Sequence, residues 1–207
     1  MQIFESQEIE NNEQIIRDVF ENGGLIIYPT ETFYGIGANP FNEEALKKIF
    51  SAKEREQTKP IPLIAANENI VESICTVTEF DEKLIRNFWP GPLTLILKVK
   101  RRFPEKIAKS GKVAIRVSSN PIATKVARIC GGLITSTSCN TSNEPPTRSI
   151  QEIPERIKNL TDIIIDNIYP LSQDKPSTIV EIYQGRINII REGVIRGEDV
   201  KKILKLK

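Results

Sequence analysis

The sequence predicts a single α/β domain. Short apolar runs with strand character recur along the 207 residues, and segments whose apolar side chains follow helical spacing lie between several of them. No internal repeat and no evident linker divides the chain, and 39% apolar residues suffice for one well-buried core of this size. The predicted domain covers residues 1–207 and contains both parallel and antiparallel strand neighbours.

The first elements are expected to be a helix, a turn and a strand. Apolar residues from Ile9 to Phe20 fall mostly at helical spacing and stop before Gly23-Gly24, after which LIIY at 25–28 is typical of a buried strand. A second helix is expected after Asn42, because this side chain suits an N-cap and two glutamates follow it in the first turn. The end of this helix would deliver Lys53 and Arg55 to a loop.

Seven further apolar runs have strand character. They lie at 63–65, 93–99, 113–117, 133–136, 163–165, 179–182 and 187–190. Helices are expected after Thr78 and after Asn120-Pro121, which form an N-cap and first-turn pair. The last two runs predict a hairpin around Gln184-Gly185, and the tail at 198–207 predicts a short basic helix.

The composition narrows the chemistry. The chain has no histidine, which removes the usual general base, the usual metal imidazole and every Ser-His or Cys-His nucleophile. Reactions at phosphates fit this constraint, since they depend mainly on orientation and on neutralising anionic oxygens with Lys, Arg and magnesium. The 29 basic and 27 acidic side chains nearly cancel, so any anion site must be local.

Compartment and redox state follow from the same sequence. Cys75, Cys130 and Cys139 are widely spaced and odd in number, which favours reduced thiols over a disulfide framework or a zinc site. The N-terminal segment has no apolar signal core, and no run is long enough to cross a bilayer. A cytoplasmic protein with no membrane partner is therefore expected.

Four segments carry more specialised residues than ordinary connections do. They are PTETFYGIGANP at 29–40, AKEREQTKP at 52–60, WPGPLT at 89–94 and STSCNTSNEPP at 136–146. Each adjoins an apolar element, where α/β proteins place binding loops, and the hydroxyl-rich stretch at 136–149 is also a candidate lid. Pro40 replaces the third glycine of a dinucleotide fingerprint, so Gly35 and Gly37 taken alone favour a tight turn. No P-loop sequence is present.

The basic residues allow two interpretations each. Lys53, Arg55 and Lys59 lie close together without helical spacing, so they either converge on one anion or form an exposed charge run. Arg116 and Arg191 each end an apolar strand, where each either clamps a carboxylate or phosphate or pairs with a nearby glutamate. The single tryptophan of the WPGPLT segment is expected to pack in the core.

Six motifs occur in a characteristic order. They are PTETFYGI at 29–36, KER with KP at 53–60, WPGPLT at 89–94, TSCNTSNEP at 137–145, PSTIV at 176–180 and IREG at 190–193. Together they resemble the YrdC/TsaC family of threonylcarbamoyl-AMP synthases, over a core of about residues 9–195. Cys139 and Asn143 stand where the family usually has alanine and glycine, and asparagine tolerates the left-handed backbone that glycine supplies.

The resemblance implies a fold and a set of site residues. The implied fold is a YrdC-like twisted, open, mixed sheet flanked by helices, with a deep concave pocket. Threonine would contact Thr32, Arg116, Ser136 and Ser177, with Arg116 at its carboxylate. ATP would contact Arg55, Lys59, Ser138, Asn140, Pro146 and Arg191. The expected catalytic residues are Lys53, Arg55 and Ser138, and no protein ligand to a metal is implied.

The resemblance also implies an activity. L-threonine, bicarbonate or carbon dioxide, and ATP with Mg²⁺ would give threonylcarbamoyl-AMP and pyrophosphate, for formation of N6-threonylcarbamoyladenosine at position 37 of tRNAs reading ANN codons. No histidine is needed, because positioning and cationic stabilisation can carry such a reaction. The implied partner is a downstream tRNA threonylcarbamoyl-transferase complex, and weak direct contact with tRNA or another RNA is a further expectation.

Two alternatives stay open at this point. The first is an RNA-binding module of the same fold without synthase activity, which predicts RNA affinity that falls steeply with salt and no dependence on threonine. The near-neutral charge weighs against it. The second is an enzyme of the same fold that handles another carbamoyl group. The sequence shows no acylphosphatase-like or zinc-finger-like segment of the kind that version would carry.

Overall fold

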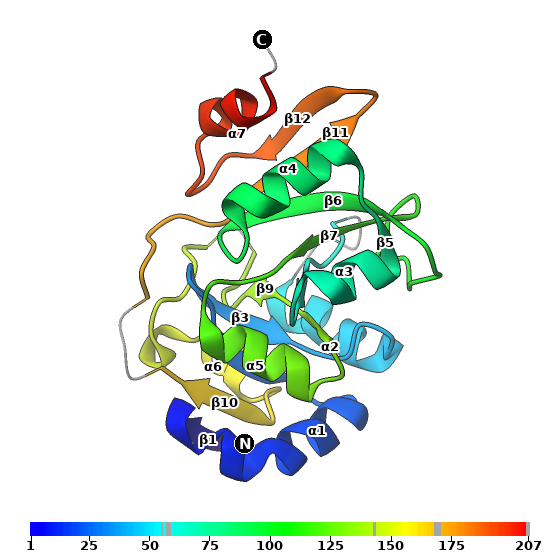
Figure 1. Ribbon diagram of the computed structural model, residues 1–207. Helices are drawn as coiled ribbons and strands as arrows, with labels where there is room; N and C mark the ends of the chain where they lie inside the picture. The colour runs from blue at the N-terminus through cyan, green and yellow to red at the C-terminus, as the bar shows by residue number, and fades with distance from the viewer. Residues whose placement is uncertain (55, 57–58, 143, 168–170, 206–207) are drawn as a thin grey trace.

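The protein folds into two mixed β-sheets with helices packed around them (Figure 1). The computed structural model describes residues 1–54, 56, 59–142, 144–167 and 171–205. The strands are β1 (Gln2–Glu5), β2 (Ile26–Pro29), β3 (Tyr34–Gly37), β4 (Leu63–Ala65), β5 (Cys75–Thr76), β6 (Leu93–Val99), β7 (Lys112–Arg116), β8 (Leu133–Thr135), β9 (Thr137–Ser138), β10 (Ile163–Asp166), β11 (Thr178–Tyr183) and β12 (Arg186–Arg191). The α-helices are α1 (Glu13–Glu21), α2 (Glu43–Lys53), α3 (Glu68–Ile74), α4 (Glu79–Phe88), α5 (Pro121–Ile129), α6 (Glu155–Lys158) and α7 (Gly197–Leu204).

The smaller sheet has the strand order β1-β10-β2-β3-β9. Strand β10 pairs parallel with both β1 and β2, whereas β3 pairs antiparallel with both β2 and β9. All four residues of β2 and of β3 are buried, as expected for strands covered on both faces.

The larger sheet has the order β12-β11-β6-β7-β4-β8, with β5 paired to the end of β6. Parallel pairs join β11 to β6 and β4 to β7, and the other pairs are antiparallel. Register shifts between Ile179 and Val180 in the β11–β12 pair, where Ile179 faces Arg191 and Val180 faces Ile189. Such a bulge turns neighbouring side chains to one side of a strand.

One residue, Ser136, joins the two sheets along the chain. Thr135 ends β8 in the larger sheet and Thr137 begins β9 in the smaller one. The Ser136 amide donates to the Pro62 carbonyl at 2.8 Å, and the buried Tyr28 hydroxyl donates to the Thr135 carbonyl at 2.8 Å. The junction is therefore fixed by hydrogen bonds on both sides.

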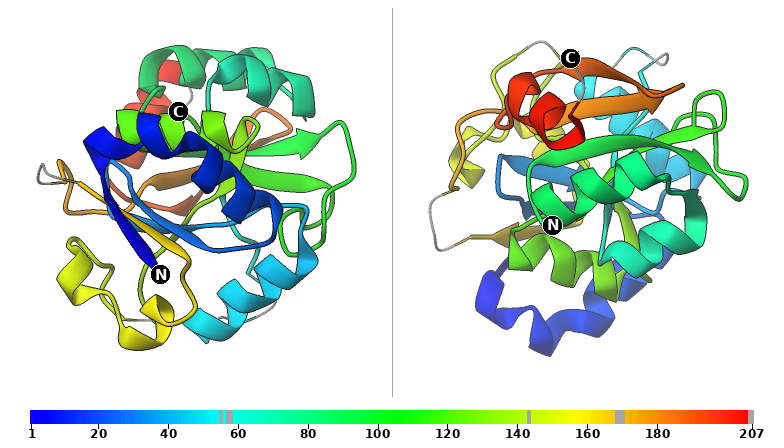
Figure 2. Two further views of the ribbon diagram at one scale, coloured as in Figure 1. Left: turned by 90° about the horizontal axis from the view of Figure 1, so that it is seen from below. Right: turned by 45° about the horizontal axis from the view of Figure 1, so that its top comes forward.

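The helices begin where side-chain caps satisfy their first amides. The Asn42 side chain accepts from the Ala45 amide, Thr78 and Asp81 form a capping box, and Asn120 accepts from the Ile122 amide. Helix α5 packs on α1 and on strands of both sheets, while α4 packs on α7 at the other end of the molecule (Figures 1 and 2). The termini lie at these opposite ends in Figure 1.

Most predicted elements are confirmed. The runs at 63–65 and 93–99 are strands with those limits, the hairpin turns at Gln184-Gly185, and a tail helix is present as α7. The tight turn predicted at Gly35 and Gly37 is wrong, because both glycines lie within β3. A Cβ at Gly37 would lie 2.5 Å from Ile134 Cδ1, so the small residue permits close packing between strands.

Within the described ranges, no helix has the length and apolar character needed to span a bilayer.

Candidate functional site

A cleft of about 700 Å³ lies between the two sheets. It is lined from the smaller sheet by β3 and β9, and from the larger sheet by β6, β7, β11 and β12. Its described lining residues are Thr30, Thr32, Phe33, Tyr34, Gly35, Lys59, Pro60, Pro62, Ile96, Lys109, Ala114, Arg116, Ser136, Thr137, Ser138, Asn140, Glu144, Pro146, Pro176, Ser177, Ile179, Ile190 and Arg191.

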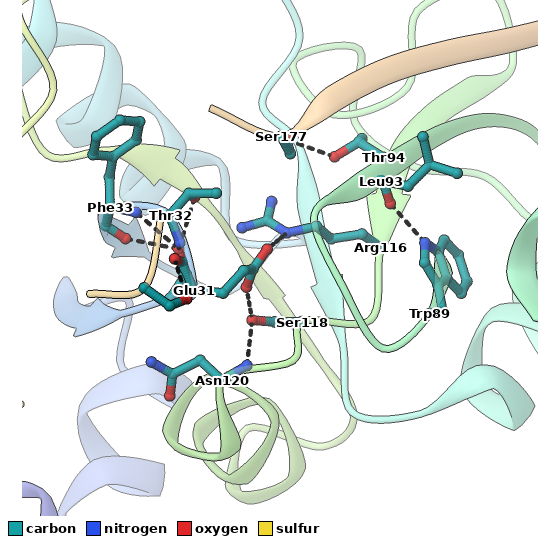
Figure 3. A network of polar contacts seen from close by, with 12 residues as sticks. Glu31, Thr32, Phe33, Trp89, Leu93, Thr94, Arg116, Ser118, Asn120 and Ser177 are labelled. Atoms are coloured by element: carbon teal, nitrogen blue, oxygen red, sulfur yellow. Dashed lines mark hydrogen bonds and ion pairs between the residues drawn. The ribbon is translucent and has the colours of Figure 1, made fainter. Parts of the chain in front are cut away.

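Arg116, the last residue of β7, presents a guanidinium to this cleft from a buried position. Its Nε donates to Glu31 Oε1 at 3.0 Å, and both side chains are nearly inaccessible, with 6% and 3% exposure. The Ser118 hydroxyl donates to the other Glu31 oxygen (Figure 3). The expected pairing with a glutamate is thus confirmed, and Arg116 also lines the cleft.

The terminal nitrogens of Arg116 remain directed to the cleft. Neither Nη atom forms a hydrogen bond with the residues that the structure describes, and in Figure 3 one lies on the side of Thr32 and the other on the side of Ser177. A fork of this kind, oriented through its Nε, matches the two oxygens of a carboxylate.

Ser177 lies across the cleft immediately before β11, where three of the sequence motifs meet. Its hydroxyl lies 2.9 Å from Thr94 Oγ1 of WPGPLT and accepts from Arg191 Nη2 at 3.1 Å. Arg191 also donates from Nε and Nη2 to the Ser177 carbonyl, at 3.1 and 2.8 Å. Arg191 therefore donates hydrogen bonds to Ser177 through Nε and Nη2, and it also lines the cleft.

Gly193 packs closely against the backbone of Pro176 and Ser177. A Cβ at Gly193 would lie 1.9 Å from the Pro176 carbonyl oxygen. Gly193→Ala is expected to lower the free energy of unfolding by about 3 kcal/mol, because the backbone beside Ser177 must move. Urea unfolding measures the loss. Gly185→Ala, at a positive φ of 72° but with nothing within 4 Å, should cost only about 1 kcal/mol. Equal losses would contradict the packing argument.

Lys53 takes a different place from the one expected. It ends α2 at 2% exposure and does not line the cleft; its ammonium donates to the Ser138 carbonyl, the Asn140 carbonyl and, at 3.1 Å, Asn140 Oδ1. Asn140 Oδ1 also accepts from the Ser138 hydroxyl at 2.6 Å, and Asn140 Nδ2 donates to the Glu144 carbonyl at 2.6 Å. Lys53 thus orders the loop that carries two expected nucleotide ligands.

Local hydrogen bonds also fix the hydroxyl groups of the PTET segment at 29–32. Thr30 Oγ1 accepts from the amides of Thr32 and Phe33, donates to the Phe33 carbonyl, and lies 3.1 Å from Thr32 Oγ1. Thr30, Thr32 and Ser136 are buried and line the cleft. Short polar side chains fixed by local hydrogen bonds can present donors and acceptors to a ligand without moving.

Nine expected site residues come together in the cleft: Thr32, Lys59, Arg116, Ser136, Ser138, Asn140, Pro146, Ser177 and Arg191. Arg55 lies outside the described residues, and Lys53 stands behind the loop. Trp89 is buried in the core and its Nε1 donates to the Leu93 carbonyl at 2.6 Å, which confirms its predicted structural role.

Sequence reasoning missed three residues at the site. Glu31 holds Arg116, Thr94 contacts Ser177, and Lys109 adds a cation to the lining. Glu31 and Thr94 stand inside motifs that were already recognised, so a signal existed. Lys109 follows a loop with no distinguishing pattern, and an isolated bridge pairs it with Lys112 at the start of β7.

More cationic than anionic side chains line the cleft. Its described lining has the cations Lys59, Lys109, Arg116 and Arg191 against the single carboxylate of Glu144. No group of three His, Cys, Asp or Glu side chains that could hold a metal ion occurs in the described part of the chain.

The thiols are set apart from this chemistry. All three cysteines are free and buried. Burial raises the pKa of Cys75 and of Cys139 to about 12, and it raises the pKa of Cys130 as well. They are therefore protonated at neutral pH and unsuited to act as nucleophiles. Burial likewise raises the pKa of Tyr34, whose hydroxyl donates to Asp166 Oδ1 at 2.8 Å.

Comparison with known proteins gives consistent matches. The Sua5_yciO_yrdC family model, described as telomere recombination, matches residues 18–193. A protein of Methanocaldococcus jannaschii provisionally named threonylcarbamoyl-AMP synthase is 35% identical over 197 residues, which cover 94% of this chain and 93% of the relative. The threonylcarbamoyl-AMP synthase of Cellvibrio japonicus is 33% identical over 172 residues, covering 82% and 90%.

Solved structures share the fold. The crystal structure of Pyrococcus abyssi Sua5 complexed with L-threonine superposes with a TM-score of 0.87 at 29% identity, covering 98% of this chain. This chain spans 61% of the length of that protein. Escherichia coli YciO superposes with a TM-score of 0.83 at 23% identity, covering 96% and 98%, and shows likeness of fold.

Proposed function

This chain belongs to the Sua5_yciO_yrdC family, and from that membership and the cleft we propose that it is a threonylcarbamoyl-AMP synthase. It joins L-threonine, bicarbonate or carbon dioxide, and ATP, and releases pyrophosphate. The observation that carries the proposal is the Arg116 fork, held by Glu31 and directed into a cleft that three further cations line.

Arg116 binds the threonine carboxylate in this proposal. Its two Nη atoms lie on the cleft side, and the hydroxyls of Thr32, Ser136 and Ser177 line the same cleft. A bidentate pair fixes the direction in which the amino acid enters, so its amine faces the incoming carbon atom. The solved complex of Pyrococcus abyssi Sua5 with L-threonine supports an amino-acid site in this fold.

ATP occupies the other part of the cleft. Lys59 and Arg191 neutralise phosphate oxygens, and Ser138 and Asn140, fixed by Lys53, contact the nucleotide together with Pro146. Arg55 stays a predicted ATP ligand. Magnesium, held by the phosphates, supplies charge neutralisation on the triphosphate when bound.

The bonds formed follow from the reactants. The threonine nitrogen attacks the carbon of carbon dioxide or bicarbonate, giving a carbamate with loss of a proton or of water respectively. A carbamate oxygen then forms a bond to the α-phosphorus as the bond to the bridging oxygen of pyrophosphate breaks. The cations of the cleft stabilise the negative charge that develops on the leaving group. A downstream transferase complex would consume the product at adenosine 37 of tRNA.

The proposal is tested by incubating the purified protein with ATP, Mg²⁺, bicarbonate and labelled L-threonine, and separating the products by chromatography. A threonine-dependent adenylate with a matching amount of pyrophosphate is expected, and it should vanish when threonine is omitted. Folded protein that binds neither ATP nor threonine and makes no pyrophosphate would rule the synthase out. Salt-sensitive RNA binding by that same protein would then favour the RNA-binding module.

A further inference from the structure

The hydroxyl pair of Thr94 and Ser177 lies in the wall of the cleft. Thr94 is fully buried in β6, and Ser177 is 4% exposed and lines the cleft. Their oxygens are 2.9 Å apart, and distance alone allows either one to donate. The direction of this bond decides whether Ser177 offers a ligand a proton or a lone pair.

The proton of Thr94 has one available acceptor. Among the residues that the structure describes, Ser177 Oγ is the only hydrogen-bond partner of Thr94 Oγ1. If Ser177 donated to Thr94, the Thr94 hydroxyl proton would be left buried without an acceptor, which carries the full penalty of desolvation. If Thr94 donates to Ser177, no buried hydroxyl proton is left over.

Arg191 occupies the second acceptor position of Ser177. Its Nη2 can only donate, and it lies 3.1 Å from Ser177 Oγ. A serine hydroxyl has two lone pairs and one proton. With one lone pair taken by Thr94 and the other by Arg191, Ser177 retains its O–H, and this proton is directed to the cleft, the remaining side of the side chain.

We infer that Thr94 is a positioning residue that makes Ser177 a dedicated hydrogen-bond donor toward the cleft. The group that Ser177 binds is therefore an oxygen acceptor. The identity of the ligand rests on the proposed function. With that function, the acceptor is an oxygen of the threonine carboxylate, of the carbamate or of the α-phosphate. The ammonium and hydroxyl protons of threonine are excluded as partners, since Ser177 has no lone pair left for them.

This assignment gives the WPGPLT motif a role in binding. The Gly91 amide donates to the Val117 carbonyl at 2.8 Å, next to Arg116, and the Thr178 amide donates to the Pro92 carbonyl at 2.9 Å, next to Ser177. The Thr94 hydroxyl adds a third hydrogen bond from this motif, to the Ser177 hydroxyl. The motif thus holds the end of β7 at Arg116 and the segment before β11 that carries Ser177, and it also decides whether Ser177 donates or accepts toward the cleft.

The kinetic test compares Thr94→Val with Thr94→Ser. Valine has nearly the same shape without a proton to donate, so kcat/KM should fall by about 10-fold, the effect of one hydrogen bond to a charged group. Thr94→Ser keeps the donor and should stay within about two-fold of the wild type. In a Ser177→Ala background, Thr94→Val should cause no further loss, because the effect passes through Ser177.

Thr178→Val is the matched control. The Thr178 hydroxyl is also buried at the start of β11, but its hydrogen-bond partners among the described residues are the Ile195 carbonyl and the Gly193 amide. Its loss should lower the melting temperature while KM for threonine and for ATP stays unchanged. Wild-type kinetics in Thr94→Val, or a loss that adds fully to that of Ser177→Ala, would overturn the inference.

Neutron diffraction from deuterium-exchanged wild-type crystals decides the direction without any ligand. A deuteron on the line between the two oxygens and bonded to Thr94 is expected, and one bonded to Ser177 would overturn the inference. This result stands even if the wild-type enzyme makes no threonylcarbamoyl-AMP, in which case the proposed function alone fails.

Discussion

Arg116→Ala is expected to lower kcat/KM for threonine by about 10³-fold, the upper range for truncating one partner of a buried, hydrogen-bonded charge pair. The variant loses the fork that we place on the substrate carboxylate, and it also leaves Glu31 as a buried carboxylate without its cation. Breaking such a pair should lower the free energy of unfolding by about 3–5 kcal/mol. Pyrophosphate release at varied threonine and thermal unfolding measure the two losses.

A double variant separates binding from folding. Glu31→Gln with Arg116→Met removes both buried charges, so it should regain most of the stability lost in Arg116→Ala while kcat/KM for threonine stays as low as in Arg116→Ala. Arg86→Ala is the surface control, because the Arg86 side chain is 78% exposed and pairs with Glu82 on the same helix. Activity returning in the double variant would show that Arg116 supports the fold and does not bind threonine.

Lys53→Met is expected to reduce kcat/KM for ATP by at least about 100-fold, with a smaller effect on threonine, because two carbonyls and Asn140 Oδ1 lose their common donor. The loop carrying Ser138 and Asn140 would no longer hold one conformation. Unfolding should become easier by about 3 kcal/mol, since this loop loses its hydrogen bonds from the buried Lys53 ammonium. Steady-state kinetics in each substrate, with chemical denaturation, measure these effects.

Lys47→Met is the matched control on the same helix. Lys47 is 57% exposed and pairs with Glu44 three residues away, so its loss should change stability by no more than about 0.5 kcal/mol. The contrast between variants is also informative, because Arg116→Ala should act mainly through threonine and Lys53→Met mainly through ATP. Equal effects of Lys53→Met on both substrates would contradict its assignment to the nucleotide loop.

Local sequence signals predicted much of the fold because each acts through its own backbone. Asn42, Thr78 and Asn120 cap the helices that were expected after them, and the hairpin turns where Gln184 and Gly185 take positive φ angles of 51° and 72°. Strands β1, β5 and β9 were missed. They are two to four residues long, and their pairing with β10, β6 and β3 depends on distant parts of the chain.

The site shows the same division. Arg116 and Arg191 were identified by their position at strand ends, and the resemblance added the hydroxyl residues around them. What Lys53 contacts could not be predicted, since the three acceptors described for its ammonium lie 85 and 87 residues further along the chain. Glu31 was overlooked because a carboxylate is expected to repel a bound anion. Its role became clear only with its buried partner, Arg116.

Substrate binding in the cleft between the sheets is expected to stabilise the folded protein. Its lining is drawn from both sheets, which meet along the chain at Ser136. A ligand that contacts both walls binds the native state and not the unfolded chain, so it raises the unfolding free energy by RT ln(1 + [L]/Kd). Supply of threonine and ATP therefore governs two quantities at once, the rate of adenylate formation and the fraction of protein that survives heat.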